Sequence, residues 1–113
     1  MWEHSLHVVD SIPADKPLLR FTGLVHDIAK PKCAQLKEDG RHLRFHGHGE
    51  AGEPIVRNIM NRLRFSNAEI ASVTELVRIH DNFIDPTPRA VRRLLGNIGE
   101  QQFLDLMVLR KAD

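Results

Sequence analysis

Seven histidines stand out in a chain of 113 residues that contains no tyrosine and only one cysteine. One of them forms a histidine–aspartate doublet, His26–Asp27, inside the apolar stretch "GLVHDIAKP". Histidine is the commonest metal ligand and titrates near neutral pH, and carboxylate oxygens bind many of the same ions. A buried polar group without a partner costs about 1–3 kcal/mol, so both side chains need something that satisfies them. The doublet therefore points to a polar site, and a metal ion is the first candidate.

Helices must position these groups, because apolar residues recur at helical spacing over most of the sequence. Proline, glycine and capping residues bound the predicted helices, which cover about residues 2–9, 17–30, 48–63, 67–80, 88–95 and 99–113. Residues 32–47 break the pattern, because Asp39–Gly40 lies between two short alternating runs and predicts an irregular loop or a small hairpin. The predicted fold is one all-α domain over residues 1–113, a compact bundle of five to six helices.

Further polar residues fall on the apolar faces of these predicted helices. His48, His80 and Asp113 each lie three, four or seven residues from core positions of their own helix, and His4 lies one turn before Val8. A single such histidine is readily explained as a hydrogen-bonded core residue. Several that converge from different helices favour a metal ion, which helix bundles hold with inward-facing side chains. Nitrogen and oxygen ligands without thiolates suit manganese, iron, nickel, cobalt, magnesium or a catalytic zinc.

This arrangement resembles the HD domain superfamily of metal-dependent phosphohydrolases, whose motif is a histidine, a later His-Asp doublet and a distant aspartate on separate helices. The amino-acid sequence is most similar to the C-terminal HD domain of bacterial tRNA nucleotidyltransferases (CCA-adding enzymes) and poly(A)-polymerase-like proteins. Five segments carry that similarity: "WEHSLHVVD", "LVHDIAKP", "FHGHGEAGEPIV", "RLRFSNAEI" and "LRKAD". His80–Asp81 is a second doublet, but the first lies in mid-bundle and precedes Lys30–Pro31, as the family motif requires.

The resemblance implies an all-α fold of the HD type and a divalent metal ion held by four residues: His4, His26, Asp27 and Asp113. Asp27 would orient a metal-bound water or take its proton, and Lys30 would stabilise the phosphoryl oxygens. The alternative for Lys30 is a cation near a helix C-terminus. His48 and His80 would hold a second ion, bind a phosphate oxygen or protonate the leaving group; alternatively they only orient other ligands.

The implied function is hydrolysis of a phosphomonoester or cyclic phosphodiester, with a phosphorylated small molecule or nucleotide as partner and tRNA reached through a parent protein. Nothing in the chain resembles the Gly-Ser run and paired aspartates of a nucleotidyltransferase, so we expect no such activity from it. The alternative is a non-catalytic module that binds tRNA or a regulatory nucleotide and keeps a vestigial metal pocket. Seven arginines could serve it, although interleaved acidic residues favour a solvated face: Arg57, Arg62, Arg64, Arg78, Arg89, Arg92 and Arg93.

Composition narrows the setting of the protein. Sixteen basic against fifteen acidic residues give no general drive toward nucleic acid or membrane, and no apolar run approaches membrane-spanning length. A lone cysteine, Cys33, fits the reducing cytoplasm, which is the expected location. Because His4 and Asp113 lie at the two ends, we expect the chain to be a piece of a longer protein. The other histidines, His7, His42 and His46, are expected on the surface or in loops.

Overall fold

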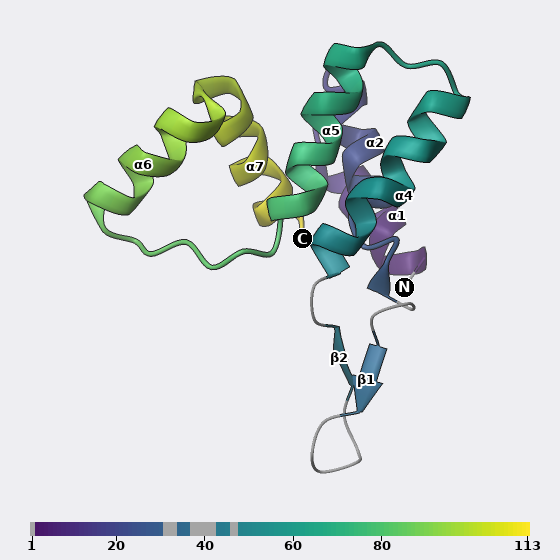
Figure 1. Ribbon diagram of the computed structural model, residues 1–113, viewed down its shortest axis with the longest axis horizontal. Helices are drawn as coiled ribbons and strands as arrows, with labels where there is room; N and C mark the ends of the chain where they lie inside the picture. Colours follow the sequence, from purple (N-terminus) through teal and green to yellow (C-terminus); the bar gives the residue numbers. More distant parts are fainter. Residues whose placement is uncertain (1, 31–33, 37–42, 46–47) are drawn as a thin grey trace.

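The computed structural model of the protein describes residues 2–30, 34–36, 43–45 and 48–113. Six helices lie in this part of the chain: α1 (Trp2–Ser11), α2 (Pro17–Val25), α4 (His48–Arg62), α5 (Asn67–Ile79), α6 (Pro88–Ile98) and α7 (Glu100–Ala112) (Figure 1). They form the predicted all-α bundle. None of the described helices is long and apolar enough to cross a membrane.

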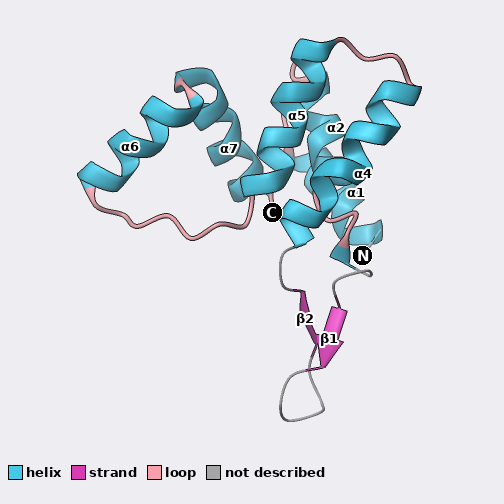
Figure 2. Cartoon of the chain, in the orientation of Figure 1, coloured by secondary structure: helices cyan, strands magenta, loops and turns pink. Residues whose placement is uncertain are grey.

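Two short strands, β1 (Ala34–Leu36) and β2 (Leu43–Phe45), project from one end of the bundle (Figure 2). They pair antiparallel, with Ala34 opposite Phe45 and Leu36 opposite Leu43. The small hairpin expected between residues 32 and 47 is therefore present. Its predicted Asp39–Gly40 turn lies outside the described residues.

Local capping residues set several helix boundaries. Ser66 Oγ accepts a hydrogen bond from the Glu69 backbone N–H (3.1 Å), while Glu69 Oε1 accepts one from the Ser66 backbone N–H (2.9 Å). This reciprocal capping box fixes the start of α5. Thr87 caps α6 through the Ala90 N–H. The predicted end of that helix near residue 95 is wrong, because α6 continues to Ile98 and breaks only at Gly99, whose φ of 87° favours glycine.

Two apolar clusters hold the bundle together, and α5 contributes to both. One cluster joins α1, α2, α5 and α7, and its buried members are Val8, Ile12, Leu19, Leu76, Ile79, Leu106 and Leu109. The other joins α2, α4 and α5, and its buried members are Val25, Val56, Met60, Ile70, Val73 and Val77. No residue of α6 is buried. That helix is held only by half-buried side chains on one of its faces.

The inner face of α4 differs from the one expected. Apolar spacing predicts Gly52, Ile55, Ile59 and Leu63 on one face, whereas the buried line passes through Gly52, Val56 and Met60, and Leu63 is 60% exposed. Gly52 belongs to both lines, and a Cβ there would lie only 3.1 Å from Val77 Cγ1, so α4 and α5 approach closely at this point. The helix turns its smallest residue toward α5, and Leu63 falls beyond the last helical residue.

The second helix also ends earlier than predicted. It stops at Val25, and residues 26–29, predicted to continue the helix, form tight turns instead. The Ile28 N–H donates to Val25 O (3.1 Å) and the Lys30 N–H donates to Asp27 O (3.0 Å), each across three residues. His26 and Asp27 therefore lie in the turn that follows α2, at the end of the bundle near the strands.

Candidate metal centre

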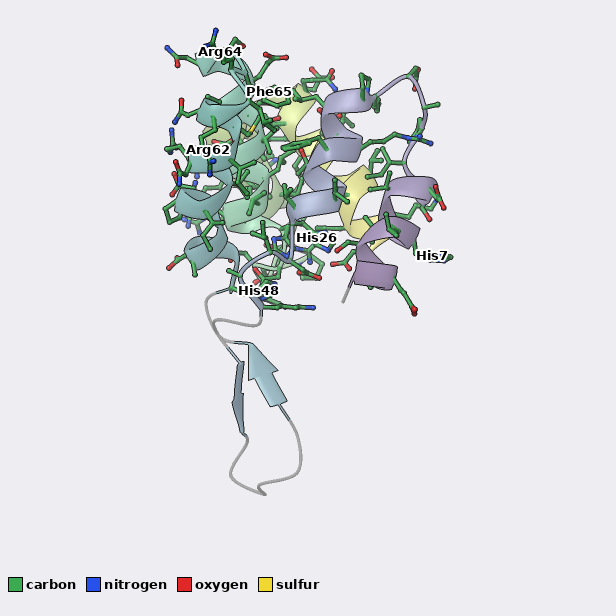
Figure 3. The ribbon with its side chains drawn as sticks, turned by 90° about the vertical axis from the view of Figure 1, so that its right-hand side faces the viewer. His7, His26, His48, Arg62, Arg64 and Phe65 are labelled. Carbon is green, nitrogen blue, oxygen red and sulfur yellow. The ribbon has the colours of Figure 1, made fainter. Side chains whose placement is uncertain are left out.

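Six predicted ligands come together at this end of the bundle, each supplied at or close to a helix end. His4 lies in the first turn of α1, His48 is the first residue of α4, and His80 and Asp113 follow α5 and α7. Figure 3 shows the labelled His26 and His48 side chains at the lower end of the helices, next to the strands. Ends of helices that are distant in the sequence therefore build a common cluster.

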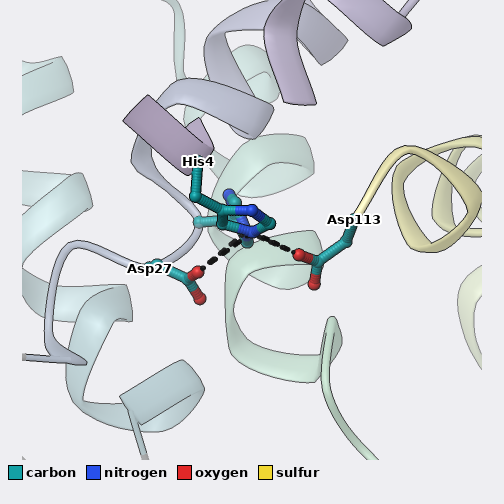
Figure 4. Close-up of side chains that lie close together, drawn as sticks. His4, Asp27 and Asp113 are labelled. Atoms are coloured by element: carbon teal, nitrogen blue, oxygen red, sulfur yellow. Dashed lines mark hydrogen bonds and ion pairs between the residues drawn. The ribbon is translucent and has the colours of Figure 1, made fainter. Parts of the chain in front are cut away.

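Four of these side chains form a first group of potential ligands, here called the His4 set: His4, His26, Asp27 and Asp113. His4 Nε2 lies 2.6 Å from Asp113 Oδ1 and 3.7 Å from Asp27 Oδ2 (Figure 4). His26 Nε2 lies 3.1 Å from Asp27 Oδ2 and 3.5 Å from Asp113 Oδ1. Ligand atoms bound at about 2.0–2.2 Å to one ion are themselves about 3–4 Å apart. Three of these four separations suit a shared ion, whereas the 2.6 Å contact between His4 and Asp113 is a hydrogen-bond distance.

The other oxygen of Asp27 belongs to a second group, the His48 set, which consists of Asp27, His48 and His80. Asp27 Oδ1 lies 3.2 Å from His48 Nε2 and 3.3 Å from His80 Nε2. The two Nε2 atoms are 3.1 Å apart. Asp27 therefore joins the two sets, with one carboxylate oxygen in each.

The hydrogen bonds of the imidazoles determine which ring nitrogens face the Asp27 carboxylate. His26 Nδ1 lies 2.6 Å from Gly23 O, and His80 Nδ1 lies 2.7 Å from Val77 O. A carbonyl oxygen only accepts hydrogen bonds, so each Nδ1 carries the hydrogen. In the neutral ring, Nε2 then presents a lone pair, and both lone pairs face the Asp27 carboxylate. Acceptors that face one another in this way need a proton or a metal ion between them.

Burial makes this arrangement costly unless it is satisfied. His26 is 0% exposed and Asp27 is 2% exposed. Among the described residues, His26 Nε2 and Asp27 Oδ2 are the buried side-chain atoms without a hydrogen bond of good geometry; they lie 3.1 Å from each other, and Lys30 Nζ also lies 3.1 Å from Oδ2. An unsatisfied buried polar atom costs about 1–3 kcal/mol. The donor atoms, their spacing and their unmet bonding therefore fit a divalent cation.

The surrounding charges keep Asp27 ionised. Burial alone would raise the pKa of Asp27, but the contacts with His26, His80 and Lys30 outweigh it and hold that pKa far below its usual range. Burial likewise acts to lower the pKa of His26, yet the adjacent Asp27 carboxylate raises it overall. The carboxylate is thus always available as an anionic ligand, and the site favours positive charge beside it.

The HD domain family matches the chain over residues 1–113. The chain belongs to the HD domain family. Members of this family bind divalent metal ions, which agrees with the donor sets described above. The family resemblance expected from the sequence motifs is confirmed.

Curated proteins similar to this HD domain include a tRNA nucleotidyltransferase and a CCA protein. An "A-adding tRNA nucleotidyltransferase" of Deinococcus radiodurans is 29% identical over 117 aligned positions, which cover 100% of this chain and 27% of the relative. A "Multifunctional CCA protein" of Legionella pneumophila (strain Paris) is 28% identical over 107 positions, covering 88% of the chain and 25% of the relative. The chain thus spans about a quarter of the length of these relatives. No solved structure gives a significant match.

Lys30 lies at the edge of the HD cluster. Its ammonium Nζ is 3.1 Å from Asp27 Oδ2, and its side chain is 30% exposed. The cation is therefore anchored on the shared carboxylate while it remains in reach of solvent. His7, predicted at the surface, is exposed, whereas His42 and His46 lie outside the described residues.

Two residues that contact the ligands were not predicted. Asp81 Oδ2 lies 3.3 Å from His48 Nδ1, so the carboxylate holds the ring with Nε2 turned toward Asp27. Arg110 Nη1 of α7 donates to the carbonyl oxygens of His80 (3.0 Å) and Asn82 (2.8 Å). The sequence contained a signal for Asp81, which stands next to His80 in the second His-Asp doublet. It held none for Arg110, which is thirty residues further along the chain.

Proposed function

We propose that this HD domain is a metal-dependent phosphohydrolase that acts on phosphomonoesters or cyclic phosphodiesters of nucleotides. The observation that carries the proposal is the sharing of the buried Asp27 carboxylate by two donor sets, with the Nε2 atoms of His26 and His80 facing it. Such a centre has no evident structural purpose, because the two apolar clusters already hold the bundle together. Its nitrogen and oxygen donors suit manganese, iron, nickel, cobalt, magnesium or catalytic zinc.

In this proposal the His4 set holds the principal ion: His4, His26, Asp27 and Asp113. A divalent ion held by these residues would supply Lewis-acid chemistry, activating water near neutral pH and polarising a phosphoryl oxygen. His48 and His80 hold a second ion with Asp27 or bind a phosphate oxygen. Because its pKa is strongly lowered, Asp27 is a weak base, so we assign to it the orientation of the attacking water rather than removal of its proton.

Lys30 supplies the remaining charge in the proposed mechanism. Its ammonium is held at the cluster by Asp27 and is partly exposed, so it can meet a substrate that arrives from solvent. A cation in this position stabilises negative charge on the phosphoryl oxygens as the bond to the leaving group breaks. The test is a loss of kcat, more than a rise in KM, when Lys30 becomes methionine.

We also propose that residues 1–113 form a single HD domain that works within a longer tRNA-processing protein. The support is that the chain spans about a quarter of the length of relatives named "A-adding tRNA nucleotidyltransferase" and "Multifunctional CCA protein". Within such a protein, nucleotide phosphates at an RNA end are suitable substrates for the phosphohydrolase. The addition of nucleotides would belong to other parts of that protein.

The deciding experiment removes metal with a chelator and then adds back manganese, nickel, cobalt, iron, magnesium or zinc. A nucleoside monophosphate, a cyclic nucleotide and p-nitrophenyl phosphate serve as substrates. We expect hydrolysis that requires metal and falls at least 100-fold in Asp27→Asn, with Asp10→Asn, an exposed carboxylate on α1, as the matched control. Metal binding without hydrolysis of any of these substrates would contradict the enzyme proposal and favour the regulatory alternative.

A further inference from the structure

Helix α6 has two chemically distinct faces. Arg89, Arg92 and Arg93 are spaced i, i+3 and i+4, so they share one face, and all three are exposed. The opposite face carries half-buried apolar residues such as Leu94 and Ile98. No acidic residue occurs between Pro88 and Ile98, and none of the three guanidinium groups forms an ion pair with any residue that the structure describes. The outer face of α6 is therefore a cluster of uncompensated positive charge.

An apolar cavity opens beside this helix. It has a volume of about 410 Å³ and lies between the start of the loop that follows α5, helix α6 and Leu106 of α7. Phe83, which lines it, is 87% exposed, an unusual state for a large aromatic ring. Ala90 and Leu94 also line the cavity; Leu94 belongs to the apolar face, whereas Ala90 lies three residues before Arg93 and therefore borders the charged face. The cationic face and the cavity thus adjoin.

We propose that this area, the α6–Phe83 surface (Phe83, Arg89, Arg92, Arg93 and the cavity), binds single-stranded RNA. The arginines meet backbone phosphates, and an unpaired base stacks on Phe83. Exposed aromatic rings next to cationic side chains are the general means of binding single strands, because every base has a face that can stack. Asn82 and Asp85 supply hydrogen-bonding groups inside the cavity that can reach a ribose 2′-hydroxyl.

The surface is connected to the candidate metal centre through a short piece of chain. Phe83 follows His80 by three residues, which span at most about 11 Å even when extended. Arg110 bonds the carbonyl oxygens of His80 and Asn82, so the start of this loop is fixed to α7. In Figure 1 the loop runs from the lower end of α5 to the far end of α6. An RNA strand on α6 could follow this loop toward the centre.

The choice of RNA rests on the nucleotide substrate proposed above, but binding is measured without turnover. A protein partner on the cavity is the competing occupant, and the unpaired arginines favour the anionic strand instead. The two occupants depend on different residues. Binding of a protein that covers the cavity would be weakened by changes at Phe83 and Leu94 and not by changes at the outer arginines.

The test uses fluorescence anisotropy of a labelled 12-nucleotide single-stranded RNA in chelator, over a range of salt concentrations. Arg92→Gln/Arg93→Gln should weaken binding about 25-fold at 0.1 M salt and reduce the salt slope by about 1.4, the values for two lost phosphate contacts. Phe83→Ala should weaken it about 5- to 150-fold, whereas Phe83→Tyr, which keeps the ring, should stay within about twofold of the unaltered protein.

The matched control is Arg62→Gln/Arg64→Gln, which removes the same charge from exposed positions at the far end of α4 (Figure 3). It should change affinity less than about twofold. The proposal is overturned if this control loses as much affinity as the α6 pair, if Phe83→Ala binds normally, or if duplex RNA or DNA of the same sequence binds as tightly. Self-association abolished by Phe83→Ala would overturn it in favour of a second copy on the cavity. Circular dichroism checks that each variant is folded, and metal-dependent hydrolysis of small nucleotides should persist in the α6 pair.

Discussion

Asp27 is the residue that both donor sets share, so its replacement by asparagine should affect every metal ion bound at the centre. Its Oδ2 belongs to the His4 set and its Oδ1 to the His48 set. Asparagine keeps the size of the side chain but removes its negative charge. It also places an NH₂ donor opposite the imidazole Nε2 atoms, and the single lone pair of each Nε2 can bind either that donor or a metal ion, not both. We therefore expect Asp27→Asn to lose the stabilisation that metal gives to the unaltered protein.

The expected size of that stabilisation follows from ligand linkage. An ion present at 100 times its Kd adds about 2.7 kcal/mol to the free energy of unfolding. A domain of 113 residues has an unfolding entropy of about 240 cal/mol/K near its midpoint, so this free energy raises Tm by about 11 °C. His80→Asn removes a ligand from the His48 set alone. It should therefore retain most of the rise that belongs to the His4 set.

The assay is differential scanning fluorimetry or calorimetry of metal-free protein, with and without manganese, nickel, cobalt or zinc. Asp10→Asn, which removes an exposed carboxylate from α1, should show the full rise in Tm. The reasoning is refuted if Asp27→Asn gains as much stability from metal as the unaltered protein. It is equally refuted if His80→Asn loses the entire rise, because the two sets would then not be separable.

Substitutions at four further positions test the positioning of the centre and the packing and capping of the helices around it. Asp81→Asn removes the negative charge beside His48 Nδ1. It should weaken metal binding about 10- to 100-fold, as measured by calorimetric titration. An unchanged Kd for the metal would exclude an orienting role for Asp81. Gly49→Ala would place a Cβ 2.8 Å from a backbone carbonyl oxygen of α5 and should cost about 1–3 kcal/mol in urea unfolding. Gly96→Ala, with nothing within 4 Å, should instead stabilise α6 by about 0.5–1 kcal/mol, and equal effects at the two glycines would contradict the packing argument. Ser66→Ala removes the capping box and should lower the free energy of unfolding by about 1 kcal/mol, measured by the same urea unfolding. Ser66→Asp keeps a side-chain cap and should restore that free energy.

The helices could be predicted where their determinants are local. Ser66 and Glu69 have the spacing of a capping box in the sequence, and the structure forms that capping box at the start of α5. The end of α2 was not predictable in the same way, because Pro31 limits how far a helix can run but does not set where it stops. Leu63 was misplaced for another reason. The inner face of α4 depends on how this helix packs on α5, which is a tertiary contact.

The candidate site also combines features that local sequence predicts with features that depend on tertiary contacts. Periodicity predicts the side of a helix on which His48, His80 or Asp113 lies, whereas the proposed ligand set as a whole came from the family resemblance. The partners of those side chains could not be read in this way. Asp81 contacts His48 across 33 positions and Arg110 contacts His80 across 30, and nothing local specifies how α4, α5 and α7 are staggered. The roles assigned to the ligands, and to Lys30, stay predictions until metal and substrate are tested.

The contact between His4 and Asp113 joins positions 109 residues apart. Contacts of such long sequence separation form late in folding, because the intervening chain must be ordered before they can close. Every helix that brings a ligand must therefore be in place before the His4 set exists. Metal affinity would then depend on completed folding. In a partly folded chain whose α7 has not packed on the bundle, Asp113 would not reach the site and the ion would bind weakly. A metal-loaded molecule would be a fully assembled one, and the cation would act as a selective stabiliser of that state alone.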